Sequence, residues 1–104
     1  MPVSKLDPAH LREALQTLPA WHHADERGGT ITREFRFDGF AQAFAFMTLV
    51  AIEADKRDHH PEWSNVYDRV TITLTTHDAA GLTLRDIELA QLADAAHSRF
   101  ARVK

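Results

Sequence analysis

The sequence contains no cysteine, which excludes disulfide bonds and thiolate chemistry from its 104 residues. It has no excess of basic residues, because the 12 lysines and arginines are outnumbered by 15 aspartates and glutamates, which gives a formal net charge of −3. A general nucleic-acid binder normally carries a basic patch, so that class is disfavoured. No apolar stretch reaches the roughly 18 residues of a membrane span, and the charged segment 1–15 lacks the apolar centre of a signal peptide. We therefore expect a cytoplasmic protein that does not contact a membrane.

The rest of the composition is typical of a folded domain. Hydrophobic residues make up 44% of the chain and charged residues 26%, a mixture that supports a small core under a solvated surface. The length suits one domain, and no repeat, low-complexity tract or linker divides the chain. We predict a single domain over residues 1–104.

Periodicity and turn residues predict the order of the secondary structure. Short connections favour antiparallel neighbours, so the order α-β-β-α-β-β-α indicates an α+β fold with its helices on one face of the sheet. The predicted elements are a helix over 7–18, a hairpin over 21–37, a helix over 38–56, two strands within 61–77 around a tight turn near Asp68, and a helix over 83–100.

Three helix starts have recognisable capping residues. Asp7 followed by Pro8 predicts the first start, because aspartate caps well and proline is tolerated at the first helical position. Asp38 is the predicted cap of the second helix. Thr83 with Asp86 three residues later predicts a capping box for the last helix.

The strand over 30–37 has one irregular position. Ile31, Phe35 and Phe37 share one face, but Arg33 falls among them and breaks the alternation of polar and apolar residues. This exception suggests that Arg33 lies at an edge of the sheet.

The helix over 38–56 is apolar nearly all round. A surface helix normally has one apolar stripe, so this one is expected to pack on its own sheet on one side and on a partner subunit on the other. The predicted stripe is Phe40, Phe44, Met47, Ala51 and Ala54, widened by Phe46, Leu49, Val50 and Ile52.

Seven histidines stand out in a chain of this length. His10 and His97 lie in predicted helices and are expected at the surface. His22 and His23 lie in a predicted strand, where adjacent side chains point to opposite faces, so we interpret that pair as structural.

His59 and His60 lie at the corner between the helix over 38–56 and the next strand. Pro61 disfavours helical conformation at the residue before it, which places both histidines in a turn. His77 is expected to end the second strand of the following pair, in phase with its threonines, and so to return to the same edge of the sheet.

Three histidines and the nearby carboxylates of Asp55 and Asp58 would then converge. Such a cluster suits acid–base catalysis, because histidine titrates near neutral pH. It also suits a three-histidine metal site, and a solvated corner without chemistry is the third interpretation. Spacing alone leaves all three open.

The run "DKRDHHPEWSNVYDRVTITLTTHDAAGLTLRD" resembles the pterin-4a-carbinolamine dehydratase family. The family pattern has a charged residue, three further residues, His-His-Pro, an aromatic residue, a histidine or tryptophan, and an aspartate. The resemblance covers nearly the whole chain and is weakest before Trp21. The pattern is filled here by Asp55, His59, His60, Pro61, Tyr67, His77 and Asp86.

The resemblance implies a lyase that dehydrates 4a-hydroxytetrahydropterin to quinonoid dihydropterin. This carbinolamine is left when an aromatic amino acid hydroxylase uses tetrahydropterin, so the reaction recycles the hydroxylase cofactor. The resemblance further implies catalysis without a metal or an organic cofactor. It implies a four-stranded antiparallel sheet with three helices on one face, and a homodimer or homotetramer.

The resemblance also implies roles for individual residues. His59 and His77 would donate protons toward the two faces of the pterin, and His60 would bind it and assist. Asp58 would orient a histidine, and backbone groups near Thr75, Thr76 and Asp78 would hold the pterin.

Supporting positions are Asp55, Pro61, Trp63 and Asp86. Asp86 has two interpretations, a site residue or a capping-box residue, and its spacing from Thr83 favours the second. Trp63 and Tyr67 are interpreted as packing residues.

Two rival functions are open from the sequence. Animal members of the family also stabilise dimers of a homeodomain transcription factor, and a binding module of this kind would use the apolar helix. A metal-binding domain or hydrolase would use the histidine corner and would contain stoichiometric zinc.

Overall fold

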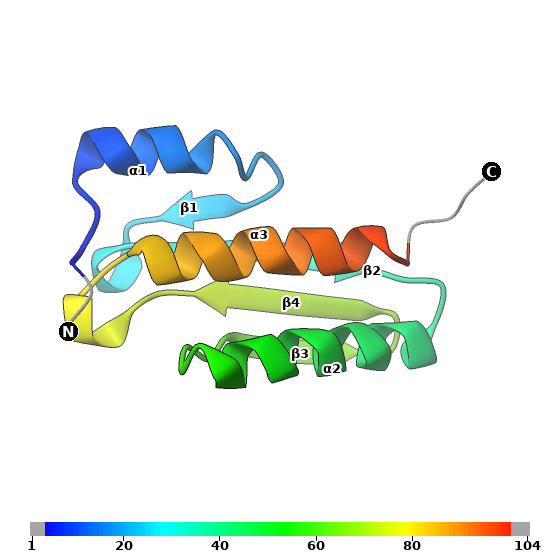
Figure 1. Ribbon diagram of the computed structural model, residues 1–104. Coiled ribbons are helices and arrows are strands. Elements are labelled where there is room, and N and C mark those ends of the chain that lie inside the picture. Colours follow the sequence, from blue (N-terminus) through cyan, green and yellow to red (C-terminus); the bar gives the residue numbers. More distant parts are fainter. Residues whose placement is uncertain (1–3, 101–104) are drawn as a thin grey trace.

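The computed structural model describes residues 4–100 and contains one four-stranded antiparallel sheet and three α-helices (Figure 1). The order α-β-β-α-β-β-α and the α+β class are confirmed. The strands lie in the order β1-β2-β4-β3. The helices are α1 (Pro8–Leu15), α2 (Phe40–Lys56) and α3 (Leu84–Ser98), and the strands are β1 (His22–Ala24), β2 (Thr30–Arg36), β3 (Glu62–Val66) and β4 (Arg69–Leu74).

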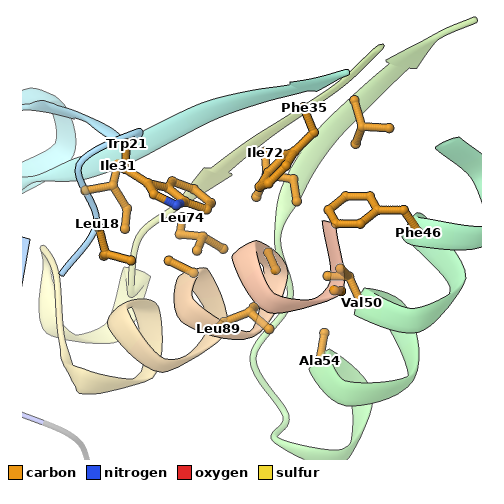
Figure 2. Close-up of a cluster of buried hydrophobic side chains, with 14 of the residues drawn as sticks. Leu18, Trp21, Ile31, Phe35, Phe46, Val50, Ala54, Ile72, Leu74 and Leu89 are labelled. Atoms are coloured by element: carbon orange, nitrogen blue, oxygen red, sulfur yellow. The ribbon is translucent and has the colours of Figure 1, made fainter. Parts of the chain in front are cut away.

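The core lies between the sheet and the helices. Alternate residues of β2 and β4 point toward α2 and α3 and are almost fully buried, as period-two strands predict. Figure 2 shows these side chains meeting apolar residues of both helices. The buried residues include Ile31, Phe35, Val70, Ile72 and Leu74 from the strands and Phe46, Val50 and Leu89 from the helices.

No helix in the span 4–100 is long and apolar enough to cross a membrane.

Two of the three predicted caps are confirmed. Asp7 accepts a hydrogen bond from the backbone N–H of His10 at 2.9 Å, and Thr83 forms the predicted capping box with Asp86. The predicted cap at Asp38 is wrong. Gly39 occupies the N-cap position, and the backbone N–H of Asp38 donates instead to Oε1 of Gln42 at 3.2 Å.

Helix α1 ends earlier than predicted. Its last residue is Leu15, and a tighter turn follows, in which the N–H of Leu18 donates to the Leu15 carbonyl at 3.0 Å. This turn carries Leu18 into the core, where it is 1% exposed. Burial of that side chain therefore stops the helix before Pro19.

The predicted stripe of α2 is wrong except at Ala54, which is the one of its five residues that is buried. The sheet-facing residues are Ala43, Phe46, Val50 and Ala54, at helical spacing. Phe40 and Phe44 lie outside the core and are 51% and 57% exposed. A helix that is apolar all round has no polar face to distinguish from a buried face. The position of the sheet therefore determines which side of α2 is buried.

Arg33 faces the helix layer, as its phase in β2 requires. Its guanidinium forms an ion pair with Asp94 of α3 at 2.6 Å and lies 4.3 Å from the ring centre of Phe35. The β1–β2 register ends at His22 opposite Thr32, so Arg33 is the first residue of β2 beyond the short strand β1. The apolar face of the sheet can hold this arginine because Asp94 of α3 supplies a carboxylate that pairs with its charge.

The expectation that His97 lies at the surface is wrong. Its ring is half-buried and makes edge contacts with Phe35, Phe37 and Phe46. Its Nε2 donates to the carbonyl of Arg36 at 3.0 Å. His97 therefore packs the end of α3 against β2. The other helical histidine, His10, is exposed as expected.

Candidate functional site

A cleft of about 260 Å³ lies where α2 ends, β4 ends and α3 begins. It brings together all three histidines and all four substrate-binding residues that the resemblance named. Two charged residues of the cleft were not predicted. The lining consists of Asp58, His59, His60, Thr75, Thr76, His77 and Asp78, with Glu62 and Arg85 in addition.

The end of α2 determines where His59 lies. Asp58 adopts a left-handed backbone conformation with φ of 50°. The N–H of His59 donates to the Ala54 carbonyl at 3.0 Å, and the N–H of Asp58 donates to the Asp55 carbonyl at 3.2 Å. This pair of bonds is the Schellman arrangement that ends many helices. It turns His59 back against the helix end, where it is 8% exposed.

His59 is fixed by a buried carboxylate. Its Nε2 lies 2.6 Å from Oδ1 of Asp86, which is 0% exposed. The other oxygen, Oδ2, accepts from the Thr76 hydroxyl at 2.7 Å and from the Thr83 N–H at 2.9 Å. Because an ionised carboxylate only accepts hydrogen bonds, Nε2 of His59 is the donor and Nδ1 is left for proton exchange. Asp86 is thus both the capping-box residue and the partner of His59.

His60 and His77 are exposed rather than fixed. His60 reaches Asp55 only at 3.5 Å, and these side chains are 60% and 87% exposed. His60 also borders a neighbouring hollow of about 440 Å³, in which three of the predicted supporting residues lie. This hollow is lined by Ala51, Ile52, Ala54, Asp55, His60, Pro61 and Trp63.

His77 does not end a strand, so that prediction is wrong. Strand β4 stops at Leu74, and His77 opens a short 3₁₀ turn, η2 (His77–Ala79). Thr76 pairs with Gly81 in an isolated bridge across this turn. The turn still returns His77 to the edge that holds His59, because β4 runs toward that edge.

The threonines of the cleft are tied down by the fold. Thr75 Oγ1 donates to the Gly29 carbonyl at 2.7 Å, and Thr76 Oγ1 lies 2.8 Å from Thr83 Oγ1 in addition to its bond to Asp86. Their hydroxyls therefore position the loops around the cleft.

The carboxylates that contact histidines differ from the expected one. Asp58 was expected to orient a histidine, but Asp86 contacts His59 and Asp55 contacts His60. Asp58 lines the cleft and supplies its backbone turn instead.

An unpredicted ion pair lies beside the cleft. Arg27 donates from both terminal nitrogens to Glu62, at 2.7 and 2.9 Å. These hydrogen bonds lower the pKa of Glu62 below its usual value and raise the pKa of Arg27. The two residues are 35 positions apart, and no local sequence signal links them.

The metal interpretation gains no support from the geometry. Within residues 4–100 no group of three or more histidine, aspartate or glutamate side chains is arranged to hold a metal ion. Nε2 of His59 is already bonded to Asp86.

Comparisons with known proteins agree with the resemblance. A family model described as pterin 4 alpha carbinolamine dehydratase matches residues 4–96. A relative from Rhizorhabdus wittichii, provisionally named a pterin-4-alpha-carbinolamine dehydratase, is 50% identical over 95 residues, which are 91% of this chain and 97% of the relative. A relative from Burkholderia multivorans with the same name is 52% identical over 99 residues, or 93% and 96% of the two chains.

Solved structures are similar as well. A Brucella melitensis protein described as a transcriptional coactivator/pterin dehydratase has a TM-score of 0.85 and 44% identity, covering 90% of this chain and 99% of that one. A pterin dehydratase-like protein, described as a RuBisCO assembly factor in the alpha-carboxysome, has a TM-score of 0.66 and 23% identity, over 75% and 89% of the chains, and shares the fold. With a family model spanning most of its length and relatives at half identity, the chain belongs to the pterin 4 alpha carbinolamine dehydratase family, a family of hydro-lyases.

Proposed function

We propose that this enzyme removes water from 4a-hydroxytetrahydropterin by histidine acid–base catalysis and yields quinonoid dihydropterin. The reaction returns the pterin cofactor of aromatic amino acid hydroxylases to a reducible form. The observation that carries the proposal is the convergence of three histidines on one cleft. The cysteine-free chain suits the reducing cytoplasm, where we place the reaction.

The chemistry needs two proton transfers. The C4a–O bond breaks as its oxygen is protonated and leaves as water, and the N5–H bond breaks as the C4a=N5 double bond forms. One proton is delivered and one is taken up, so no net acid or base is consumed. Positioned acid–base groups contribute about 10²–10⁴-fold to such steps.

The three histidines divide this work. We assign protonation of the 4a-hydroxyl to His59 and His77, one for each face of the ring on which that hydroxyl can lie. We assign to His60 binding of the ring and assistance as the base that takes the N5 proton. The bond to Asp86 supports the role of His59, because it fixes the ring and leaves Nδ1 for exchange. The exposure of His60 and His77 supports the roles assigned to these two residues, because exposed rings can turn toward a substrate.

The first prediction tests reaction and site together. The wild type should accelerate dehydration of freshly generated 4a-hydroxytetrahydropterin, followed by absorbance. His60→Ala should lower kcat/KM by about 10²-fold or more with an unchanged melting temperature, because His60 is exposed. His22→Ala is the matched control, since His22 is an exposed histidine of β1 outside the cleft. Equal rates for wild type and His60→Ala would rule out the assigned site.

We also propose that the chain forms a homodimer or homotetramer, in part through α2. Phe40, Phe44 and Ile52 are about half exposed on the outer side of this helix, and the rings of Phe40 and Phe44 pack together at 5.8 Å. Apolar side chains exposed side by side favour contact with another surface.

The second prediction concerns this assembly. Light scattering should give the wild-type mass as a multiple of 11.8 kDa. Phe44→Glu should reduce it, because a charge in an apolar contact is costly. Leu84→Glu is the control, since Leu84 is similarly exposed at the start of α3. A wild-type monomer would refute the proposal.

A further inference from the structure

The ring of His77 has no side-chain partner that fixes it. His59 is bonded to the buried carboxylate of Asp86. The imidazole of His77, in contrast, makes no hydrogen bond or ion pair with another residue of the span 4–100. The place of His77 at the cleft therefore depends on the backbone of the turn that carries it.

This turn is a short loop that is closed at its base by one pair of residues. The N–H of Thr76 donates to the Gly81 carbonyl at 3.0 Å, and the N–H of Gly81 donates to the Thr76 carbonyl at 3.3 Å. Between them lies Ala80, whose backbone is left-handed with φ of 56°. A residue other than glycine keeps this conformation only where its surroundings enforce it. The loop that carries His77 therefore depends on contacts at its base.

The segment before α1 supplies such a contact. We call residues 4–7 the N-terminal strap, and Figure 1 shows it running from the start of α1 to the yellow turn η2. The N–H of Leu6 donates to the carbonyl of Leu82 at 2.9 Å, and Leu82 is 1% exposed. The strap is thus tied to the core at the residue that follows Gly81.

The side chain of Lys5 lies over Gly81 itself. A Cβ added to Gly81 would lie 2.5 Å from Cε of Lys5, 3.0 Å from its Cδ and 2.7 Å from the carbonyl oxygen of Gly28. Only a glycine permits so close an approach. The ammonium group of Lys5 forms no ion pair with any other described residue. Lys5 therefore contacts the base of the loop through its methylene groups, as long cationic side chains often do.

We propose that Lys5 is a positioning residue for His77. Its methylene groups hold Gly81 in place, and Gly81 closes the loop that presents His77 to the cleft. The inference rests on the proposed function, because it assigns to the N-terminal strap the placement of one of the two proton donors.

Loss of this contact should leave the fold intact. Lys5 is exposed, and α1, which follows the strap, has no buried residue. Segments with few buried contacts open at a low free energy while the rest of the molecule stays folded. A substitution at Lys5 should therefore release the loop of His77 without unfolding the core.

The first test compares Lys5→Ala with Lys5→Met in the dehydration of 4a-hydroxytetrahydropterin. Lys5→Ala removes the methylene groups, so kcat should fall about 10-fold, since misplacing a catalytic group by 1 Å can cost about 100-fold. KM should change little, because the other residues of the cleft are untouched. Methionine has Sδ and Cε where lysine has Cδ and Cε, so Lys5→Met should keep most of kcat.

Arg12→Ala is the matched control and should keep the wild-type kcat, since Arg12 is an exposed cationic residue of α1. An unchanged kcat in Lys5→Ala would overturn the proposal. An equal loss of kcat in Lys5→Met would also overturn it, because the charge of Lys5 would then act in place of its methylene groups.

A double-mutant cycle tests whether Lys5 acts through His77. Lys5→Ala should have no further effect on kcat in the His77→Ala background, because the group that Lys5 positions is absent. A general weakening of the fold would lower kcat by the same factor in both backgrounds. Equal factors would therefore overturn the positioning role.

Amide hydrogen exchange separates this inference from the proposed function. The N–H groups of Ala80 and Gly81 donate within the loop and at its base, at 3.0 and 3.3 Å. Both should exchange about 10-fold faster in Lys5→Ala and at the wild-type rate in Lys5→Met, while exchange at Ile72 in the core stays unchanged.

Two outcomes of this measurement differ in what they refute. If exchange changed as expected but the wild type did not catalyse dehydration, the proposed function would fail and the hold of Lys5 on the loop would stand. If the wild type were active and Lys5→Ala changed neither exchange nor kcat, the positioning role alone would be overturned.

Discussion

Asp86→Ala is expected to reduce stability more than the loss of any side chain that lines the cleft, and to reduce activity as well. The substitution leaves the Thr83 N–H, the Thr76 hydroxyl and Nε2 of His59 without their buried acceptor. Unsatisfied buried groups cost about 1–3 kcal/mol each, so we expect a loss of about 3–5 kcal/mol by denaturant unfolding. His59 would lose its orientation, and kcat/KM should fall about 10²-fold or more under conditions where the variant is folded.

Asp94→Ala is the control for this prediction. Asp94 is a second carboxylate of α3 that accepts hydrogen bonds, from Trp21 at 2.9 Å and from Arg33 at 2.6 Å, but it does not line the cleft. Its loss should reduce stability while the folded fraction keeps its activity. If both variants kept the same activity per folded molecule, Asp86 would have no role beyond the fold.

Gly28→Ala is expected to reduce stability about as much as Asp86→Ala. A Cβ at this position would lie 1.9 Å from the carbonyl oxygen of Ala80, and the backbone is left-handed, with φ of 84°. Backbone strain and overpacking each cost about 1–3 kcal/mol. A loss of about 3–5 kcal/mol should lower the melting temperature by on the order of 15 °C or more. Activity should also fall, since Ala80 directly follows the turn that begins with His77.

Gly39→Ala provides the comparison. Its backbone is extended, and the nearest atom to an added Cβ would be the Tyr67 hydroxyl at 3.9 Å. The melting temperature should fall by only several degrees, because alanine is a poorer N-cap than glycine. A similar decrease in melting temperature in both variants would show that the contact between Gly28 and Ala80 does not constrain the loop that carries Gly28.

Two of the three helix caps were predictable from residues within one turn of the helix start. The cap at Asp7 and the capping box of Thr83 with Asp86 depend on residues within one turn, and both are present. The buried side of α2 depends on the sheet, so an apolar helix could not reveal it. The cap at Gly39 was missed because a glycine cap carries no side-chain signal.

Most residues that line the cleft were predictable from the sequence, but their contacts with one another were not. The resemblance named seven of the nine residues that line the cleft. It did not reveal that Asp86 contacts His59, because that contact spans 27 positions and follows from how α2 and α3 pack. The ion pair of Glu62 with Arg27 could not be predicted either, because the two residues are 35 positions apart in the sequence. The Schellman turn had no glycine to mark it, since Asp58 takes the left-handed position.

Under the proposed mechanism, the shared use of Asp86 couples the first turn of α3 to the rate of the reaction. Helix ends open locally with free energies below that of global unfolding. Whenever this turn frays, the carboxylate that caps it also moves away from His59, and the proposed mechanism predicts an inactive molecule whose core largely persists. We therefore expect this local opening to set the upper temperature limit for activity. Slow amide hydrogen exchange at Arg85 and Asp86 would mark a homologue adapted to work at higher temperature.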